Sequence, residues 1–445
     1  MDTVAQNKVE TLKDKLESKT ALIGVVGLGY VGLPFVVEKA KVGFRVKGVE
    51  RNLERVAAVN GARNYISDVK DEELKRYVES GRITAGTSFE VVPELDVIVI
   101  CVPTPLSTNL TPDLSYIESV THSIAEHLRP GQLVTLESTT YPGTTDEIMR
   151  PILEGSGLKQ GEDFFLAHSP ERVDPGNKRY TTKNTNKVVG ASDAASLEVA
   201  TLFYQQTIDH VVPVSSAKAA ELTKVFENTY RAVNIALVNE LTLLCDRMEI
   251  DVWEVLDAAN TKPFGIMPFY PGPGVGGHCI PIDPHYLEWK AKEFNFNTRF
   301  IGLAGEINRR MPEYVIDKAA RVLNAQAKAL RGSQILVLGA AYKSDLADWR
   351  ESPAIEVIEG LLEVGADVHY HDSFVPEIEV KGKRLESIPL TPDILSASDL
   401  VIITTAHSDV DYVQVIGEAK VVFDTRGVTR HLALSETDKA KVTLL

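Results

Sequence analysis

A short apolar segment followed by a glycine-rich turn places the strongest constraint on this chain. Residues 21–32 have the sequence ALIGVVGLGYVG, which contains the motif Gly27-x-Gly29-x-x-Gly32. Gly27 permits a tight turn, Gly29 lets a pyrophosphate approach the backbone, and Gly32 allows close packing of a helix on a strand. Because Pro34 suits the first turn of a helix, the segment predicts a strand, a phosphate-binding turn and a helix.

An acidic residue after the next apolar segment favours NAD as the ligand of this turn. Glu50 ends the segment RVKGVE, eighteen positions after Gly32. A carboxylate there accepts hydrogen bonds from a ribose 2′-hydroxyl and disfavours a 2′-phosphate, so NAD is expected rather than NADP. The adjacent Arg51 weakens this preference. A tight structural turn without a ligand is the alternative interpretation of the glycine motif.

Strand-like and helix-like segments alternate along most of the chain. The strand-like segments are ALIGVVG, RVKGVE, LDVIVICV, GQLVTLES, DFFLAHSP and HVVPVS, and later QILVLGAAY, ADVHYHD, DLVIITTA and KVVFDTRG. This alternation predicts βαβ units and mostly parallel sheets. We therefore expect an α/β fold with two Rossmann-like, doubly wound parallel-sheet domains joined by a long central helix.

Four regions follow from this pattern. We expect a charged, helical N-terminal extension, an NAD-binding domain, a central helical domain and a second α/β domain, over residues 1–20, 21–214, 215–325 and 326–445. Apolar spacing predicts helices over residues 216–248, 251–260, 284–294 and 299–323. Residues 262–284, KPFGIMPFYPGPGVGGHCIPIDP, are dense in proline and glycine, which predicts a long ordered loop rather than regular helix or central strand.

Composition excludes several classes of protein. The 47 basic and 62 acidic residues give a net charge of −15, which argues against a general nucleic-acid binder or a basic membrane-surface protein. The longest apolar run, residues 95–102, is far shorter than the roughly 20 residues that span a bilayer, and residues 1–20 lack a signal-peptide core. Three cysteines are too few for a disulfide framework, so we expect a cytoplasmic protein. No metal is expected.

Five polar residues are candidates for chemistry. Cys279 lies between glycines and prolines, where a thiolate is able to attack a carbonyl, although a small buried cysteine with a packing role is the alternative. Lys224 and Asn228 share one face of the long helix and in a cleft would stabilise an oxyanion; a solvated helix surface is the alternative. Glu171 follows a predicted strand end, where it would polarise a water or pair with Arg172. His278 is a weaker candidate for a general base.

Several segments also carry a resemblance to a known family. They are GLGYVGLP, ICVPTP, ESTTYPGTT, SPER, ELTKVFENTYRAVNIALVNE, GPGVGGHCIPIDP and GAAYKSDLADWRES. Together they resemble the UDP-glucose/GDP-mannose dehydrogenase family, which oxidises the C6 alcohol of a nucleotide sugar to a carboxylate with two NAD and one water. SPERVDPGN and KPFGIMPFYPGPGVGGHCIPIDPHYL are similar to the branch that acts on UDP-N-acetylhexosamines, especially UDP-N-acetylglucosamine. UDP-glucose and UDP-N-acetylmannosamine are the alternative substrates.

The resemblance implies roles for the candidate residues. Cys279 would trap the C6 aldehyde, Lys224 would stabilise the oxyanion, Asn228 and Asp283 would position the reacting oxygen or a water, and Glu171 and Thr139 would handle water or protons. The cofactor would contact Gly27, Gly29, Tyr30, Val31, Gly32, Glu50, Arg51, Thr104, Ser138 and Thr139. The UDP-sugar would contact Glu171, Arg172, Lys224, Asn228, Phe269, Tyr270, Gly276, Arg299, Lys343 and Arg350.

One departure from the family pattern concerns an arginine. UDP-glucose enzymes place an arginine upstream of the GGxC segment, whereas residues 262–265 of this chain are KPFG, so Arg299 is the substitute candidate. The resemblance also implies a homodimer formed through the central helix. Two rival functions remain open: a 3-hydroxyacid-type or 6-phosphogluconate-type dehydrogenase, which performs one oxidation and needs no cysteine, and a non-catalytic NAD-binding regulator.

Overall fold

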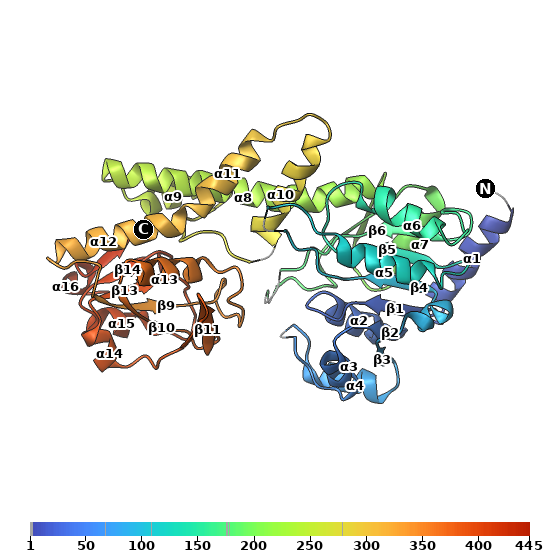
Figure 1. Cartoon of the computed structure of the whole chain (residues 1–445), viewed down its shortest axis with the longest axis horizontal. Coiled ribbons are helices and arrows are strands. Elements are labelled where there is room, and N and C mark those ends of the chain that lie inside the picture. Colours follow the sequence, from blue (N-terminus) through green and yellow to red (C-terminus); the bar gives the residue numbers. More distant parts are fainter. Residues whose placement is uncertain (1–2, 67, 108, 175–176, 178, 278) are drawn as a thin grey trace. The chain divides into compact units, whose positions relative to one another are not determined.

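The chain forms two compact units. The computed structural model describes residues 3–66, 68–107, 109–174, 177, 179–277 and 279–445 (Figure 1). Unit 1 comprises residues 1–227 and 285–296, and unit 2 comprises residues 228–284 and 297–445. The long helix α8 (Ala217–Met248) contributes to both units and confirms the predicted central helix. Among the described residues, no helix has the length and apolar character needed to cross a bilayer.

Unit 1 is built on an eight-stranded sheet with the order β3-β2-β1-β4-β5-β6-β7-β8. The strands are β1 (Leu22–Val26), β2 (Arg45–Val49), β3 (Ile83–Gly86), β4 (Val97–Ile100), β5 (Leu133–Leu136), β6 (Phe165–His168), β7 (Lys187–Ala191) and β8 (Val211–Val214). Neighbouring strands pair in parallel except β6 and β7, which are antiparallel. The α/β class with parallel sheets is thus confirmed, and β3 and β7 are the strands of this sheet that the sequence did not reveal.

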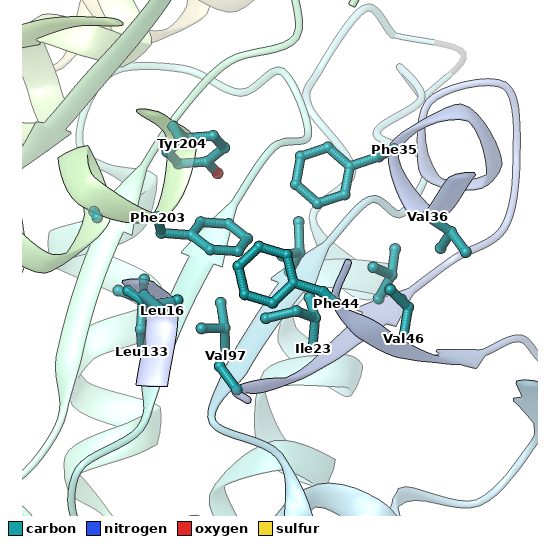
Figure 2. Close-up of a cluster of buried hydrophobic side chains, with 14 of the residues drawn as sticks. Leu16, Ile23, Phe35, Val36, Phe44, Val46, Val97, Leu133, Phe203 and Tyr204 are labelled. Atoms are coloured by element: carbon teal, nitrogen blue, oxygen red, sulfur yellow. The ribbon is translucent and has the colours of Figure 1, made fainter. Parts of the chain in front are cut away.

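Helices cover this sheet and bury their apolar faces against it. They are α1 (Thr3–Glu17), α2 (Gly32–Lys41), α3 (Leu53–Asn60), α4 (Asp71–Glu79), α5 (Ser115–Ala125), α6 (Arg150–Glu154) and α7 (Ala194–Gln205), with short turns η1 (Phe89–Glu94) and η2 (Thr144–Met149). Figure 2 shows Phe203 of α7 beside Phe44, and the Tyr204 ring of the same helix lies 6.3 Å from that of Phe35. Leu16 of α1 is fully buried in the same cluster. The N-terminal extension is therefore part of the core of unit 1.

Unit 2 contains a five-stranded parallel sheet with the order β10-β9-β13-β14-β15. The strands are β9 (Gln334–Leu338), β10 (Asp367–His371), β13 (Leu400–Ile403), β14 (Val422–Asp424) and β15 (Val442–Leu444), and a separate hairpin joins β11 (Glu377–Val380) to β12 (Lys383–Glu386). The helices are α9 (Val252–Asn260), α11 (Arg299–Arg309), α12 (Met311–Ala325), α13 (Pro353–Glu363), α14 (Pro392–Ala397), α15 (Tyr412–Glu418), η3 (Val428–His431) and α16 (Glu436–Lys439). The hairpin and β15 were not predicted.

Two helix predictions need correction. Helix α10 (Cys279–Lys292) begins five residues before the predicted start, so the end of the proline- and glycine-rich segment is helical rather than loop. Pro281 is compatible with this because it lies in the first turn, where backbone N–H groups have no partner within the helix. The single helix predicted over residues 299–323 is two helices, α11 and α12, and Pro312 stands at the start of the second.

Candidate active site

The glycine turn after β1 has the geometry of a phosphate-binding turn. Gly27 has a φ of 91°, and a Cβ there would lie 2.4 Å from the carbonyl oxygen of Cys101. A Cβ on Gly32 would lie 1.8 Å from the carbonyl oxygen of Gly27, whereas a Cβ on Gly29 would meet no described atom within 4 Å. The outer glycines are therefore required for close packing, and the middle one opens onto space at the start of α2, where unpaired N–H groups favour an anion.

Glu50 lies beside this turn with part of its acceptor capacity in use. Its Oε2 accepts the N–H of Leu28 at 2.9 Å, and its Oε1 accepts the N–H of Asn52 at 3.0 Å. A carboxylate has about four acceptor positions, so two are left for the hydroxyls of a ribose. The guanidinium carbon of the neighbouring Arg51 lies 4.9 Å from the centre of the Tyr116 ring. These residues fit the adenosine and pyrophosphate part of NAD.

Hydroxyl groups brace the loops that follow β4 and β5. Ser138 Oγ donates to the carbonyl of Val102 at 2.7 Å and accepts its N–H at 3.0 Å. Thr104 Oγ1 donates to the carbonyl of Thr139 at 2.8 Å. The hydrogen bonds of these three predicted cofactor residues thus fasten the two loops to each other at the carboxyl edge of the sheet, next to the glycine turn. The side chain of a fourth, Tyr30, is exposed at the turn itself.

A buried ion cluster holds Glu171 at the same edge of the sheet. The ammonium of Lys187 on β7 lies 3.2 Å from Glu171 Oε2 and also pairs with Glu137, and both Lys187 and Glu137 are buried. Tyr204 Oη donates to Glu137 Oε1 at 2.6 Å. Burial disfavours the charged form of Glu171, but Lys187 and two backbone N–H groups outweigh it and hold its pKa below the usual value. Glu171 is therefore a fixed carboxylate.

Arg172 does not form the predicted side-chain pair with Glu171. Glu171 Oε1 instead accepts the backbone N–H groups of Arg172 and Val173, at 2.7 and 2.8 Å. The Arg172 guanidinium binds Glu227 of α8, with Nε 3.2 Å from Oε2, and the carbonyl of Asn186 at 2.7 Å. Arg172 is thus held on α8, and its carboxylate partner is Glu227.

Helix α8 carries the polar residues that were predicted to act on the substrate. Asn228 Nδ2 donates to Asp283 Oδ2 of α10 at 2.5 Å, and both side chains are buried. Lys224 is half-buried and lies one turn before Asn228 on the same helix. Cys279 is the first residue of α10, four positions before Asp283, but its side chain and all of His278 lie outside the described part of the chain.

Glu221 is a residue of α8 that sequence reasoning missed. It is buried, and its carboxylate accepts the N–H of Gly143 at 2.5 Å and both the N–H and the hydroxyl of Thr145, at 2.8 and 2.7 Å. Burial raises the pKa of Glu221 to about 7. The residue ties α8 to the turn that follows Thr139. An acidic residue among apolar neighbours of the predicted helix was the available signal.

The glycines before Cys279 pack on the loop after β9 in unit 2. A Cβ on Gly276 would lie 2.8 Å from both Tyr342 Cβ and Pro353 Cδ. Lys343, next to Tyr342, is half-buried, so Gly276 and Lys343 belong to one neighbourhood. Arg350 is exposed and binds Asp348 through Nε and Nη2, at 2.8 and 2.7 Å.

Aromatic and basic residues of unit 2 complete the predicted substrate contacts. The Tyr270 ring stacks on Trp253 with centroids 5.8 Å apart, and the Phe269 ring lies 6.0 Å from that of Tyr230. Arg299 is exposed at the start of α11. Its assignment stays a prediction.

Arg426 is a second residue that sequence reasoning missed. It follows β14, and its Nε donates to the carbonyl of Thr404 at 2.7 Å. A Cβ on Gly272 would lie 2.7 Å from its Nη1, so the guanidinium lies against the proline- and glycine-rich segment. Burial lowers the pKa of Arg426 to about 10. A half-buried cation at the carboxyl edge of a parallel sheet is a candidate group for binding a diphosphate.

Comparisons with known proteins match the whole layout. Residues 21–208, 218–310 and 336–431 match the NAD binding, central and UDP binding domains of the UDP-glucose/GDP-mannose dehydrogenase family. Protein CapL of Staphylococcus aureus is 35% identical over 91% of this chain and 96% of its own length. UDP-N-acetyl-D-glucosamine 6-dehydrogenase of Pseudomonas aeruginosa is 35% identical over 88% and 92%. The solved UDP-D-ManNAc dehydrogenase of Pyrococcus horikoshii superposes with a TM-score of 0.84 at 32% identity, covering 93% of this chain and 96% of that one.

Proposed function

Because this chain belongs to the UDP-glucose/GDP-mannose dehydrogenase family, we propose that it oxidises the C6 alcohol of a UDP-N-acetylhexosamine, UDP-N-acetylglucosamine in the first place, to the carboxylate. Membership of this family makes the chain an NAD-dependent nucleotide-sugar dehydrogenase. What we propose is therefore the identity of the sugar and the catalytic steps. Relatives with comparable identity carry names that specify N-acetylglucosamine or N-acetylmannosamine, and UDP-N-acetylmannosamine is therefore the second candidate.

The observation that carries the proposed chemistry is the buried pair of Asn228 and Asp283. The two side chains join α8, which bears Lys224, to α10, which begins at Cys279. In an apolar setting such a pair would hold a hydroxyl or a water in one orientation, and the ammonium of Lys224 would stabilise negative charge as it develops on oxygen. NAD, when bound at the glycine turn of unit 1, supplies the acceptor for the hydride that leaves C6.

Cys279 would allow both oxidations to occur on one bound sugar. Its thiolate adds to the C6 aldehyde and forms a C–S bond, and the resulting thiohemiacetal becomes a thioester when its hydroxyl loses a proton and C6 gives a second hydride to a second NAD. Water then attacks the thioester carbon, the C–S bond breaks, and the carboxylate leaves with the thiol restored. Glu171, held as a carboxylate by Lys187, would orient that water by accepting one of its protons in a hydrogen bond.

An apolar stripe on α8 supports the proposed homodimer. Leu222, Phe226, Tyr230, Leu237 and Leu244 recur at helical spacing, and each has at least 40% of its side chain exposed. Exposed apolar stripes of this kind on a long helix mark association surfaces. Measurement of the mass in solution tests this part of the proposal: a monomer at micromolar concentration would contradict it.

The sugar and the stoichiometry can be tested together. The purified chain is incubated with NAD and UDP-glucose, UDP-N-acetylglucosamine, UDP-N-acetylgalactosamine or UDP-N-acetylmannosamine, and NADH is followed by absorbance. We expect two NADH per sugar, with UDP-N-acetylglucosamine turned over most efficiently. One NADH per substrate would favour a single-step dehydrogenase, and NAD binding without turnover of any sugar would favour a regulator.

The role of Cys279 is tested by replacing it with serine. Cys279→Ser should form no net uronate, because a serine alkoxide is a poor leaving group after the second oxidation. Cys245→Ser, on α8, is the matched control and should keep the full reaction. Complete two-step turnover by Cys279→Ser would refute the covalent route.

A further inference from the structure

The sheets of both units end in the same arrangement of a glycine turn and an acidic residue. In unit 1, β1 pairs with β2, Gly27 follows β1 with a φ of 91°, and Glu50 follows β2. In unit 2, β9 pairs with β10, Gly339 follows β9 with a φ of 91°, and Asp372 follows β10. Asp372 therefore occupies the position at which a Rossmann domain places the residue that binds a ribose.

Asp372 differs from Glu50 in how many hydrogen bonds it already accepts. Its Oδ2 accepts the N–H groups of Ala340 and Ala341 at 2.7 and 2.9 Å and lies 2.9 Å from His407 Nε2. Its Oδ1 accepts two further N–H groups, those of Phe374 and Val375, at 2.9 and 3.0 Å. These five bonds use the roughly four acceptor positions of a carboxylate, and the side chain is buried. Asp372 has no capacity left for a ribose.

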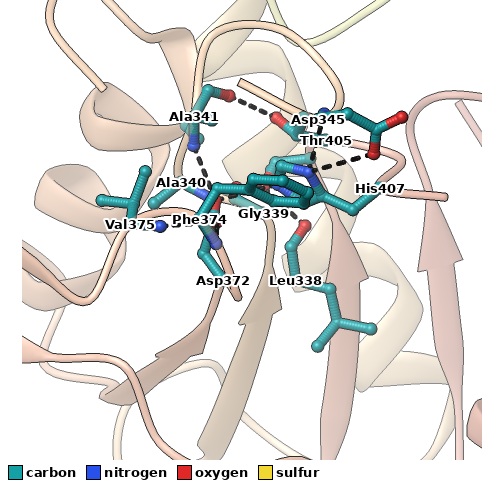
Figure 3. A network of polar contacts seen from close by, with 12 residues as sticks. Leu338, Gly339, Ala340, Ala341, Asp345, Asp372, Phe374, Val375, Thr405 and His407 are labelled. Carbon is teal, nitrogen blue, oxygen red and sulfur yellow. Dashed lines mark hydrogen bonds and ion pairs between the residues drawn. The ribbon is translucent and has the colours of Figure 1, made fainter. Parts of the chain in front are cut away.

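His407 extends this network to the far end of the same loop (Figure 3). Its Nδ1 accepts the N–H of Asp345 at 3.0 Å, so its proton lies on Nε2, from which it is donated to Asp372. The Phe374 ring stacks on the His407 ring with centroids 5.0 Å apart and planes inclined by 25°. Asp345 has a φ of 61°, an uncommon value for a residue other than glycine, which indicates that its surroundings impose this conformation.

The loop between β9 and Asp345 is thus fixed before and after Lys343. Before it, Ala340 and Ala341 donate their N–H groups to Asp372, which follows β10, and the carbonyl of Ala341 accepts a hydrogen bond from Thr405 Oγ1, which follows β13, at 2.6 Å. After it, Asp345 donates its N–H to His407. Gly339 cannot be replaced in this arrangement, because a Cβ there would lie 2.5 Å from Thr405 Cβ. Lys343 lies between the two anchored points.

We propose that Asp372 and His407 are positioning residues for nucleotide binding by unit 2, because together they set the conformation of residues 339–345 and so the position of Lys343. The ligand is a nucleoside diphosphate, which unit 2 binds through cations and backbone rather than through a carboxylate on the ribose. This inference rests on the proposed function, in which Lys343 contacts the diphosphate of a UDP-sugar.

The experiment measures UDP and NAD binding separately in the full-length protein. Isothermal titration of UDP and of NAD is carried out on the wild type, Asp372→Asn, His407→Phe and Asp399→Asn. Asn at position 372 turns an N–H donor toward other donors, and Phe at position 407 keeps the stacking on Phe374 but loses both hydrogen bonds. Asp399 is the matched control, since it accepts the N–H of Gln334 at 3.1 Å at the opposite edge of the same sheet.

We expect Asp372→Asn and His407→Phe to weaken the binding of UDP and to leave the binding of NAD unchanged. The Kd for UDP should rise at least tenfold in Asp372→Asn and His407→Phe, while the Kd for NAD stays within twofold of the wild type. The KM for the nucleotide sugar should rise similarly, with kcat at saturation within threefold. Hydrogen exchange of peptides covering residues 339–345 should become faster in both. Asp399→Asn should change none of these quantities.

Each other outcome decides a different question. Unchanged UDP affinity in the folded variants, or equal weakening by Asp399→Asn, would overturn the positioning role. If hydrogen exchange of residues 339–345 is unchanged in His407→Phe, the positioning role is overturned without reference to any ligand. If Asp372→Asn does not fold, His407→Phe alone tests the positioning role. A wild type that binds no UDP would overturn the proposed function. Hydrogen exchange of residues 339–345 would then still test the positioning role of Asp372 and His407.

Discussion

His168 should make unit 1 sensitive to acid. The residue ends β6, is fully buried, and among the described residues neither of its ring nitrogens has a hydrogen-bond partner. Burial, with a contribution from the charge of Lys187, lowers the pKa of His168 to about 3. Protonation of the folded state is therefore strongly disfavoured at any pH at which the enzyme works.

The size and sign of the effect follow from proton linkage. A histidine in the unfolded chain has a pKa of about 6.5, so between about pH 6.5 and pH 3 the unfolded chain binds a proton that the folded chain does not. The stability contributed by the neutral ring is present above about pH 6.5 and is lost as the pH falls, at about 1.4 kcal/mol per pH unit. Between pH 7 and pH 5 the loss is about 2 kcal/mol.

The variant His168→Leu removes the proton site at nearly constant side-chain volume. Its free energy of unfolding at pH 7 should equal or exceed that of the wild type, because two unpaired polar atoms leave the core. From pH 7 to pH 5 that free energy should fall by about 2 kcal/mol less than in the wild type. Hydrogen exchange of peptides that cover β5 and β6, followed across a series of urea concentrations, gives the free energy of unfolding of unit 1 by itself.

His122→Leu, an exposed position on α5, is the control and should keep the pH dependence of the wild type. If His168→Leu loses as much stability between pH 7 and pH 5 as the wild type, the assignment of this acid sensitivity to His168 is wrong.

Three further changes test the site and the core. Lys224→Ala should lower kcat by roughly 100-fold or more while the Kd for NAD stays within twofold, since we propose that its charge stabilises the developing oxyanion; a matching loss of NAD affinity would contradict this. Lys187→Met should raise the pKa of Glu171 and move the acid limb of the kcat/KM profile to higher pH, and an unmoved limb would count against the ion cluster. Leu16→Ala should destabilise unit 1 to urea by about 2–5 kcal/mol, because α1 packs in the core; a loss below 1 kcal/mol would show that α1 is dispensable.

The sequence predicted most elements whose apolar pattern is strong and missed most of those whose pattern is weak; β7, KVVGA, is an exception, because it is fully buried and was still missed. Continuous apolar runs such as those of β1 and β4 identified most of the parallel strands, because both faces of such strands are buried. The strand β3, ITAG, is short and half-exposed, and the hairpin of β11 and β12 is rich in charges, so neither carries such a run. The start of α10 was missed because its prolines were taken as helix breakers, whereas Pro281 lies in the first turn, where proline is tolerated, and Pro284 lies inside the helix.

Contacts between residues distant in sequence could not be predicted from spacing. The hydrogen bond from Asn228 to Asp283 joins positions 55 residues apart, and the ion pair of Lys187 with Glu171 depends on the antiparallel pairing of β6 with β7. Motif positions therefore named the individual candidates, but the partner that fixes each one comes from tertiary structure.

The two glycine turns show why the type of a residue does not by itself determine what a site binds. Glu50 and Asp372 each follow the second strand of a parallel pair and accept backbone N–H groups of the turn beside them. Glu50 accepts two such bonds and keeps acceptor positions for a ribose, whereas Asp372 accepts five bonds and keeps none. The difference arises from His407 and from the turn after Asp372, neither of which is marked by the motif. The hydrogen-bonding capacity that folding leaves unused therefore differs between these two carboxylates, although both follow the second strand of a parallel pair.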